Sequence, residues 1–317
     1  MNKVAFMFPG QGAQAVSMGH DLYENSNAAK QIFDSACEIL NKDIKKLCFE
    51  GPEEELKQTI NTQSCLLTVS IAAYEAFKEK MNLTPDYTLG HSLGEYSAMY
   101  VSGVMDLENV LFAIQKRSEL MQEACDLSKE GAMAAVLGSS EDIINECLEI
   151  ASSKGLVSVA NYNEPNQIVI TGESDAVNYA SQLIKEHGAR KVVPLAVSGG
   201  FHSKLMQSAT DTFVDFVQKL KINDAKIPVV TNLDAQYTTS AADFIKKMPI
   251  QISNSVYWSQ SIKKLLSDGV DTFIEFGSGR VLSGLNKKMC EANVKTYNVS
   301  DMSSLQSTVN ELNLAKV

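Results

Sequence analysis

The segment Gly90-His91-Ser92-Leu93-Gly94 has the G-x-S-x-G spacing of a nucleophile elbow. The short apolar segment 87–89 precedes it and a helical pattern over 93–101 follows, which is the strand–turn–helix context that this turn requires. Such a turn exposes the serine hydroxyl at the start of a helix, where free backbone N–H groups can stabilise an oxyanion. We therefore predict that Ser92 is a nucleophile. The alternative is a chance match in a glycine turn.

A serine nucleophile needs a general base, and the chain contains four histidines. His202 is the candidate, because it follows a predicted strand that ends in the glycine-rich loop 197–201. Loops at strand ends are where α/β folds place reactive groups. His91 adjoins Ser92, but successive side chains at such a turn point apart. We therefore predict that His202 is the base and that His91 has a structural role.

Arg117 lies on the apolar stripe of a helix predicted over 107–123. Val110, Ile114, Arg117 and Met121 follow one another at spacings of four, three and four residues. An inward arginine is costly unless it meets an anion, and a carboxylate that accepts two hydrogen bonds is its natural partner. The partner is either an aspartate or glutamate of the protein or the carboxylate of a substrate. The second alternative would mean an enzyme that handles an acyl group with a free carboxylate.

The glycine loop Phe8-Pro9-Gly10-Gln11-Gly12 follows the first predicted strand, 4–8. No Gly-Lys-Ser/Thr follows it, and a dinucleotide-binding G-x-G-x-x-G is also missing. A simple turn is therefore the alternative to a binding loop.

Elements that position these residues can be predicted from the hydrophobic pattern. The continuous apolar run 4–8 is typical of a buried parallel strand, and the strand–helix alternation that follows indicates an α/β fold. The middle of the chain predicts the order β-α-β-β-α-β of a ferredoxin-like unit. After it we expect buried strands at 228–231 and 272–276 and closing helices at 281–291 and 303–312.

We therefore predict an α/β fold with two domains. Residues 1–127 and 198–317 form an α/β-hydrolase-like catalytic domain with a parallel sheet, and residues 128–197 form an inserted ferredoxin-like subdomain. The length of 317 residues agrees with roughly two units of about 150 residues each.

Composition excludes several classes of function. The net charge of −10 disfavours nonspecific nucleic-acid binding. Six cysteines are scattered singly without a C-x-x-C pair, which argues against a zinc or redox motif and for free thiols in a reducing compartment. No stretch approaches the roughly 18 apolar residues of a membrane span, and the N-terminal apolar run is too short for a signal peptide. We expect a cytoplasmic protein that binds no membrane and no metal.

Several segments together resemble the malonyl-CoA:acyl carrier protein transacylase family. They span nearly the whole chain in the family's order: 8–12, 90–95, Arg117 with Met121-Gln122, 161–172, 201–203 and 251–258. The resemblance implies that Ser92 is the nucleophile, that His202 is its base and that the main-chain carbonyl of Gln251 orients His202.

The resemblance also implies a binding site around these residues. Backbone N–H groups of Gln11 and Leu93 would form the oxyanion hole, and Arg117 would hold the malonyl carboxylate. Phe201 resembles the malonyl-selective version of the family, because a bulky ring leaves little room for an α-methyl branch. The remaining expected substrate-binding residues are Met121 and Asn161.

The implied activity is transfer of a malonyl group from malonyl-CoA to the phosphopantetheine thiol of acyl carrier protein, through a malonyl-serine intermediate. The partners would be acyl carrier protein and a CoA thioester, with no cofactor, and we expect a monomer. Three positions depart from the family's usual pattern, where Ser118, Ser255 and Ser278 replace glycine, proline and proline.

Three alternatives remain open. A serine esterase or thioesterase of the α/β-hydrolase type predicts a late histidine, but none follows His202. A trans-acting acyltransferase of polyketide synthesis would use the same residues on another carrier. A non-catalytic acyl-binding or carrier-docking module would retain the fold without acylating Ser92.

Overall fold

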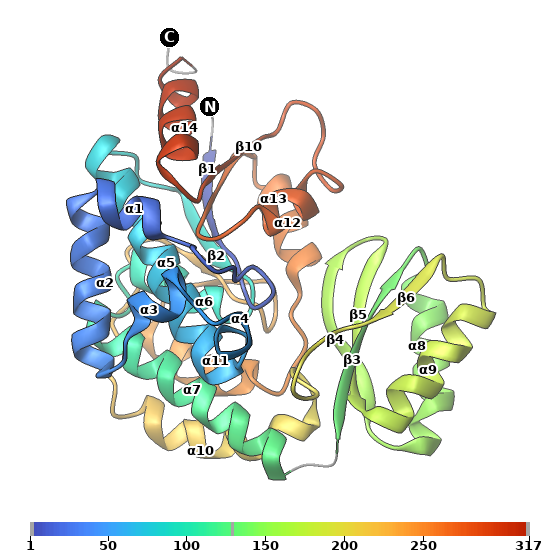
Figure 1. Cartoon of the computed structure of the whole chain (residues 1–317). Helices are drawn as coiled ribbons and strands as arrows, with labels where there is room; N and C mark the ends of the chain where they lie inside the picture. The colour runs from blue at the N-terminus through green and yellow to red at the C-terminus, as the bar shows by residue number, and fades with distance from the viewer. Residues whose placement is uncertain (1–2, 128–129, 315–317) are drawn as a thin grey trace.

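The computed structural model of the chain describes residues 3–127 and 130–314 and contains two sheets, one of six strands and one of four. Figure 1 shows the smaller sheet, in green and yellow, beside a larger body that is built from both ends of the chain. The chain therefore enters the smaller unit from the larger body and returns to it.

The larger sheet has the strand order β10-β9-β1-β2-β7-β8. Its first five strands run parallel, and β8 joins the edge antiparallel to β7. The predicted parallel sheet is confirmed, but the antiparallel edge makes it mixed. The bounds are β1 (Lys3–Phe8), β2 (Tyr87–Gly90), β7 (Val229–Val230), β8 (Tyr237–Thr238), β9 (Val270–Phe276) and β10 (Lys295–Val299).

The first strand is central, which explains its composition. β1 lies between β9 and β2, and every residue from Val4 to Phe8 is buried. A parallel strand covered on both faces has no solvent side, so its sequence is continuously apolar instead of alternating. By contrast, β10 lies at the edge and carries the mostly polar residues KTYNV. That composition is why the sequence pattern did not predict β10.

Helices cover both sides of the larger sheet (Figure 1). The central helix α5 (Thr59–Lys80) is buried on all sides over most of its length, as expected of a helix packed inside a body. The helix predicted over 107–123 is confirmed as α7 (Leu107–Leu127), which packs on α5 and on α10. The other helices before the inserted unit are α1 (His20–Asn25), α2 (Asn27–Leu40), α3 (Ile44–Phe49), α4 (Glu53–Leu56) and α6 (Gly94–Val101). Those after it are α10 (Gln207–Val217), α11 (Ala241–Gln251), α12 (Trp258–Ser267), α13 (Val281–Asn286) and α14 (Met302–Leu314).

One helix prediction needs correction, and two helices were missed. The helix predicted over 281–291 ends at Asn286, because the chain turns there and the Met289 and Cys290 N–H groups both donate to the Asn286 carbonyl. The helices α11 and α12 were not predicted. Pro249, near the end of α11, is a residue type that normally argues against a helix.

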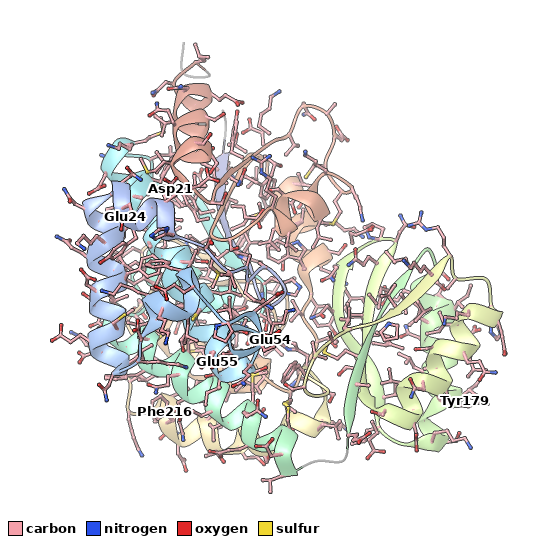
Figure 2. The ribbon with its side chains drawn as sticks, viewed as in Figure 1. Asp21, Glu24, Glu54, Glu55, Tyr179 and Phe216 are labelled. Atoms are coloured by element: carbon pink, nitrogen blue, oxygen red, sulfur yellow. The ribbon has the colours of Figure 1, made fainter. Side chains whose placement is uncertain are left out.

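The smaller sheet confirms the predicted ferredoxin-like order. Its strands are arranged β4-β5-β3-β6, and all pairs are antiparallel. Both helices of the unit lie on one face of the sheet, and Figure 2 labels Tyr179 in the second of them. The first residue of the predicted 128–197 subdomain lies outside the described residues, and both boundaries stay predictions. The bounds are β3 (Gly131–Leu137), α8 (Glu141–Ala151), β4 (Val157–Glu164), β5 (Gln167–Glu173), α9 (Ser174–Glu186) and β6 (Lys191–Pro194).

A short backbone pairing joins the two units. Val256, in the loop after α11, donates its N–H to the Ala160 carbonyl at 2.8 Å and accepts from Tyr162 N–H at 3.0 Å. The Ser255 hydroxyl, at one of the three departures from the family pattern, donates to the Val159 carbonyl at 2.6 Å. Edge strand β4 therefore fixes the loop 252–257, which matters for the site because this loop contacts His202.

Candidate active site

The serine turn at the end of β2 requires glycine on both sides. Ser92 has a φ of 52°, which is a left-handed conformation that a non-glycine residue rarely adopts. A Cβ on Gly90 would come within 1.9 Å of the Gly94 carbonyl carbon, and a Cβ on Gly94 within 2.1 Å of the Phe8 carbonyl oxygen. The backbone segments touch here, so only hydrogen fits. The turn therefore has the two features of a nucleophile elbow, which are closely packed backbone segments and a serine with a strained backbone conformation.

Asn232, which follows β7, holds this turn in place. Its Oδ1 accepts a hydrogen bond from Ser92 N–H at 2.7 Å, and its Nδ2 donates to the Gly90 carbonyl at 2.7 Å. Sequence reasoning missed this residue. The available signal was its position at the carboxyl end of a predicted strand, where polar side chains gather in α/β folds.

His202 lies in hydrogen-bond contact with the serine. Its Nε2 is 2.8 Å from Ser92 Oγ, and its Nδ1 is 3.0 Å from the carbonyl oxygens of both Gln251 and Asn254. Carbonyl oxygens only accept, so Nδ1 carries the ring hydrogen and Nε2 offers its lone pair to the hydroxyl. The resemblance implied the Gln251 carbonyl at this place, whereas the Asn254 carbonyl was not anticipated.

Burial keeps this histidine neutral. Desolvation, followed by the positive charge of Arg117 and the neighbouring His91, lowers the pKa of His202 to about 3, although the two carbonyl contacts act to raise it. At neutral pH the imidazole is therefore unprotonated and able to accept the serine proton.

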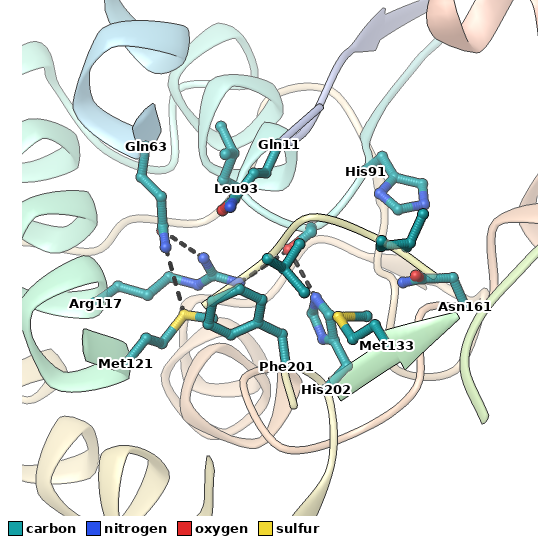
Figure 3. A pocket seen from close by; sticks show the side chains of 13 residues that line it. Gln11, Gln63, His91, Leu93, Arg117, Met121, Met133, Asn161, Phe201 and His202 are labelled. Carbon is teal, nitrogen blue, oxygen red and sulfur yellow. Dashed lines mark hydrogen bonds between the residues drawn. The ribbon is translucent and has the colours of Figure 1, made fainter. Parts of the chain in front are cut away.

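Arg117 reaches the same hydroxyl from α7. Its Nη2 donates to Ser92 Oγ and to Gln251 Oε1, each at 3.1 Å, and its Nη1 donates to Gln63 Oε1. Figure 3 shows Gln63, Arg117 and Met121 on one side of the cavity, and Phe201 and His202 close to its centre.

The guanidinium is buried without a bound carboxylate. Only 1% of the Arg117 surface is exposed, and none of the ion pairs within residues 3–127 and 130–314 includes it. Two glutamines and a hydroxyl are neutral partners, so the charge of Arg117 is hydrogen-bonded but not paired at short range. The alternative of an aspartate or glutamate clamped on Arg117 is therefore wrong. A buried cation of this kind favours an anionic ligand.

A cavity of about 100 Å3 lies between these groups. A water molecule needs about 10–15 Å3 of such space, so a small acyl group can be accommodated. The predicted residues Gln11, Leu93, Met121, Asn161 and Phe201 all line it. The additional lining residues are Gln63, His91, Met133, Leu195 and Val197, together with Ser92, Arg117 and His202.

Two backbone N–H groups at the cavity have no protein acceptor in the part of the chain that the structure describes. They belong to Gln11 and Leu93, the pair expected to form an oxyanion hole. Leu93 precedes the first residue of α6, at the positive end of the helix dipole. Both donors are therefore available to a ligand.

His91 points away from the Ser92 hydroxyl, as expected. Its Nε2 is 2.9 Å from Asn163 Oδ1, and its ring packs on Trp258. The acidic run 53–55 forms the exposed start of α4, and Figure 2 labels Glu54 and Glu55 there. No metal-binding group of three or more His, Cys, Asp or Glu side chains was found among the described residues. Within the same residues, no helix is long and apolar enough to cross a membrane.

Comparisons with known proteins point to one family. The family described as "Acyl transferase domain" matches residues 5–306. The malonyl CoA-acyl carrier protein transacylase of Bacillus subtilis (strain 168) is 45% identical over 313 residues, covering 98% of each chain.

Solved structures agree with this match. The malonyl CoA-acyl carrier protein transacylase of Clostridium perfringens is 37% identical with a TM-score of 0.94, covering 99% of this chain and 98% of its own. A malonyl-transacylase in complex with a type II PKS acyl-carrier protein is 35% identical with a TM-score of 0.93, covering 98% of this chain and 99% of its own.

Proposed function

The chain belongs to the malonyl-CoA:acyl carrier protein transacylase family of acyl transferases, and from this membership we propose how its residues carry out the reaction. The enzyme is an S-malonyltransferase that moves a malonyl group from malonyl-CoA to the phosphopantetheine thiol of acyl carrier protein, a step of fatty acid biosynthesis. The observation that carries the mechanism is the buried Arg117 guanidinium at 3.1 Å from the Ser92 hydroxyl.

Acylation of Ser92 is the first step. His202 Nε2 takes the hydroxyl proton as Ser92 Oγ attacks the thioester carbonyl. The resulting oxyanion accepts hydrogen bonds from the N–H groups of Gln11 and Leu93; losing one such donor costs roughly 3–4 kcal/mol in comparable sites. The proton then passes to the departing CoA sulfur, which leaves malonyl-Ser92. The step forms one ester bond, breaks one thioester bond and releases no net proton.

Transfer to the carrier repeats these events in reverse. The phosphopantetheine thiol gives its proton to His202 and attacks the malonyl-Ser92 carbonyl. The same two N–H groups stabilise the second oxyanion, and Ser92 recovers its proton from His202. A serine ester is close to a thioester in reactivity, so both directions remain accessible.

Selectivity for malonyl comes from Arg117 and Phe201. A malonyl carboxylate gives the buried Arg117 guanidinium an anionic partner in place of neutral ones. An acetyl group has no carboxylate and therefore leaves the positive charge of Arg117 unpaired. The Phe201 ring is buried at the cavity wall, where it restricts room for the α-methyl branch of methylmalonyl. Met121 and Asn161 complete the lining of the substrate site.

Acyl carrier protein is the partner, and its docking surface needs a local positive charge. Transacylases of this family act on acidic carriers, while this chain itself carries a net charge of −10. The candidate basic residues are all exposed, and Lys288 also lies 3.0 Å from the carboxylate of the buried Glu164. They are Lys185, Arg190, Lys191, Lys287 and Lys288.

The fatty-acid carrier is the first choice of acceptor. A carrier of polyketide synthesis is the second candidate, because a similar malonyl-transacylase is bound to a type II PKS carrier. We also propose a monomeric cytoplasmic enzyme. No disulfide joins the six cysteines, all of which lie in the described residues, and this supports a reducing compartment.

The decisive experiment measures the intact mass of the protein after mixing with malonyl-, methylmalonyl- and acetyl-CoA in parallel. A malonyl adduct that disappears in Ser92→Ala, and that a carrier thiol removes much faster than water does, is the expected result. Loss of the adduct to water at the same rate as to thiol would favour an esterase. No adduct at all would favour a non-catalytic binding module.

A further inference from the structure

Glu95 is a buried carboxylate that the mechanism above does not use. It lies in the first turn of α6, three residues after Ser92, and is 1% exposed. Its Oε2 accepts a hydrogen bond from Asn232 N–H at 2.6 Å, and the polar side chain of Gln251 also stabilises its ionised form. A fully buried carboxylate is costly, so its position beneath the nucleophile calls for an explanation.

Both partners of Glu95 hold parts of the active site. Asn232 bonds to Ser92 N–H and to the Gly90 carbonyl. Gln251 donates from Nε2 to the Ser92 carbonyl at 3.0 Å and accepts from Arg117 Nη2 at 3.1 Å. Glu95 is therefore connected through one residue to the serine turn and through another to the guanidinium.

Glu95 also balances the charge of Arg117. The charged groups that act on the Glu95 carboxylate are Arg117 on α7 and Lys247 on α11, and Tyr96 on its own helix interacts with it as well. Lys247 Nζ lies 2.7 Å from Asp234, so its charge already has a partner. Among the described residues, Arg117 donates hydrogen bonds to neutral groups, and the nearby negative charge that acts on it is that of Glu95.

A bound malonyl group changes this balance. Its carboxylate adds a second negative charge on the other side of the same guanidinium. Two carboxylates that share one buried cation interact unfavourably, and protonation of one relieves the repulsion. The malonyl carboxylate contacts Arg117 directly, so Glu95 is the group that is neutralised.

We propose that Glu95 is a proton-linked positioning residue, which takes up a proton from solvent when a malonyl carboxylate binds Arg117 and so makes malonyl selectivity stronger at lower pH. The proposal rests on the assignment of Arg117 to the malonyl carboxylate. Acylation itself is proton-neutral, because the Ser92 hydroxyl proton leaves on the CoA thiol. Any proton taken from solvent therefore reports a linked group.

The ionisation of Glu95 lies in a suitable range. Burial raises the pKa of Glu95 to about 7, against the hydrogen bonds from Asn232 and Gln251 and the attraction of Arg117, which lower it. An added malonyl charge raises the pKa further. Proton uptake is then expected above about pH 7, where Glu95 is ionised in the free enzyme. It should cease at the higher pH where Glu95 remains ionised even with malonyl bound.

The first test measures proton uptake by the wild-type enzyme on acylation in weak buffer with a pH indicator. Malonyl-CoA should cause uptake of a fraction of a proton per adduct, and acetyl-CoA should cause none. An infrared difference spectrum of malonyl-enzyme against free enzyme should show a new protonated carboxyl band. A malonyl adduct without uptake or band would overturn the role of Glu95, whereas failure to form any adduct would overturn the proposed function instead.

The second test compares Glu95→Gln with wild type, using the malonyl-to-acetyl ratio of kcat/KM. In wild type the ratio should fall by about fivefold from about pH 6 to about pH 8.5, because ionised Glu95 opposes the malonyl charge. In Glu95→Gln it should vary by less than about twofold over that range and exceed the wild-type ratio at high pH.

A matched control is Glu275→Gln. Glu275 is also fully buried, and burial raises its pKa, but it bonds to Leu282 and Ser283 at the start of α13 and does not line the cavity. This variant should keep the wild-type pH dependence of the ratio. The same pH dependence in Glu95→Gln as in wild type would mean that Glu95 is only structural. If Glu95→Gln does not fold, the wild-type proton and infrared measurements decide the question.

Discussion

The Ser92 hydroxyl is shared by two groups of different charge. It contacts the neutral His202 at 2.8 Å and the cationic Arg117 at 3.1 Å. Since the guanidinium can only donate and His202 Nε2 can only accept, the hydroxyl hydrogen points to the histidine. Arg117 therefore contacts the Ser92 hydroxyl and, in our proposal, also binds the substrate carboxylate.

Replacing Arg117 should change substrate preference more than it changes the chemistry. In Arg117→Ala we expect malonyl transfer to fall by about 100-fold or more, as when a charged hydrogen-bonding partner of a buried ligand group is removed. Acetyl transfer should rise relative to malonyl, because no buried charge is left unmatched. Parallel kcat/KM measurements with both CoA thioesters check this. An unchanged ratio would contradict the assigned role.

The buried His202 should stay an active base in acid. Because its pKa is lowered to about 3 from an ordinary value of 6.5, the single-turnover rate of Ser92 acylation by acetyl-CoA should change by less than about twofold between about pH 7 and about pH 5. A loss of rate centred near pH 6.5 would contradict the neutral, buried imidazole. In His202→Ala acylation should be abolished at every pH, and a normal burst would indicate another base.

The same pKa shift has a consequence for stability. The unfolded chain binds a proton at this histidine as the pH falls below 6.5, while the folded protein does not until about pH 3. The contribution of His202 is therefore fully present above pH 6.5 and is lost as the pH falls through that window.

At the scale of elements, the site depends on how closely β1, β2 and α6 approach one another. The serine turn lies against the end of β1, since a Cβ on Gly94 would meet the Phe8 carbonyl oxygen at 2.1 Å. The loop after α11 brings the Gln251 and Asn254 carbonyls to His202, and its pairing with β4 holds that loop. Strand ends and one loop therefore place groups that are distant along the chain.

Gly94→Ala should damage both stability and acylation. The added methyl group meets backbone that cannot move aside, so we expect a loss of about 3 kcal/mol or more in the free energy of unfolding. Urea denaturation and the yield of the malonyl adduct measure the two effects.

Gly284→Ala is the matched control for this substitution. Nothing lies within 4 Å of a Cβ at Gly284, which is inside helix α13 and has no positive φ. Alanine should therefore stabilise the protein by about 0.5–1 kcal/mol and leave acylation unchanged. Equal behaviour of the two variants would contradict the close packing at the serine turn.

The whole molecule combines a large body that carries Ser92 with a smaller unit that lines the same cavity. Cavity residues come from both: Ser92 and Arg117 from the large body, Met133 and Asn161 from the smaller sheet. The carrier must present its phosphopantetheine thiol to this cavity. Basic residues on both units are therefore suitable for docking an acidic carrier.

Reversing the charge of these basic residues should weaken the docking of acyl carrier protein but leave the acyl-transfer reaction itself unchanged. In Arg190→Glu combined with Lys287→Glu we expect kcat/KM for acyl carrier protein to fall by about tenfold, with a reduced dependence on salt. Transfer to free pantetheine, a neutral thiol acceptor, should be unchanged. Equal loss for both acceptors would indicate damage to the site, and no loss for the carrier would place docking elsewhere.

The local sequence pattern by itself determined much of the predicted fold and of the candidate site. The serine turn was predictable because glycine is obligatory where backbones touch, and the β-α-β-β-α-β order because each element carries its own hydrophobic period. The inward position of Arg117 also followed from helical spacing. The sheet edges were not predictable, since short or polar strands such as β8 and β10 have no strong pattern.

Only the tertiary structure decided what surrounds the reacting groups. Gln63, Asn232 and Asn254 reach their partners over 54, 140 and 52 residues of chain, a separation at which neighbouring sequence carries no information about contact. The structure likewise excludes a carboxylate of the described residues as the close partner of Arg117, because it brings amides to the guanidinium instead. A side chain's type shows what it can bind, but the packing of distant segments determines what it meets.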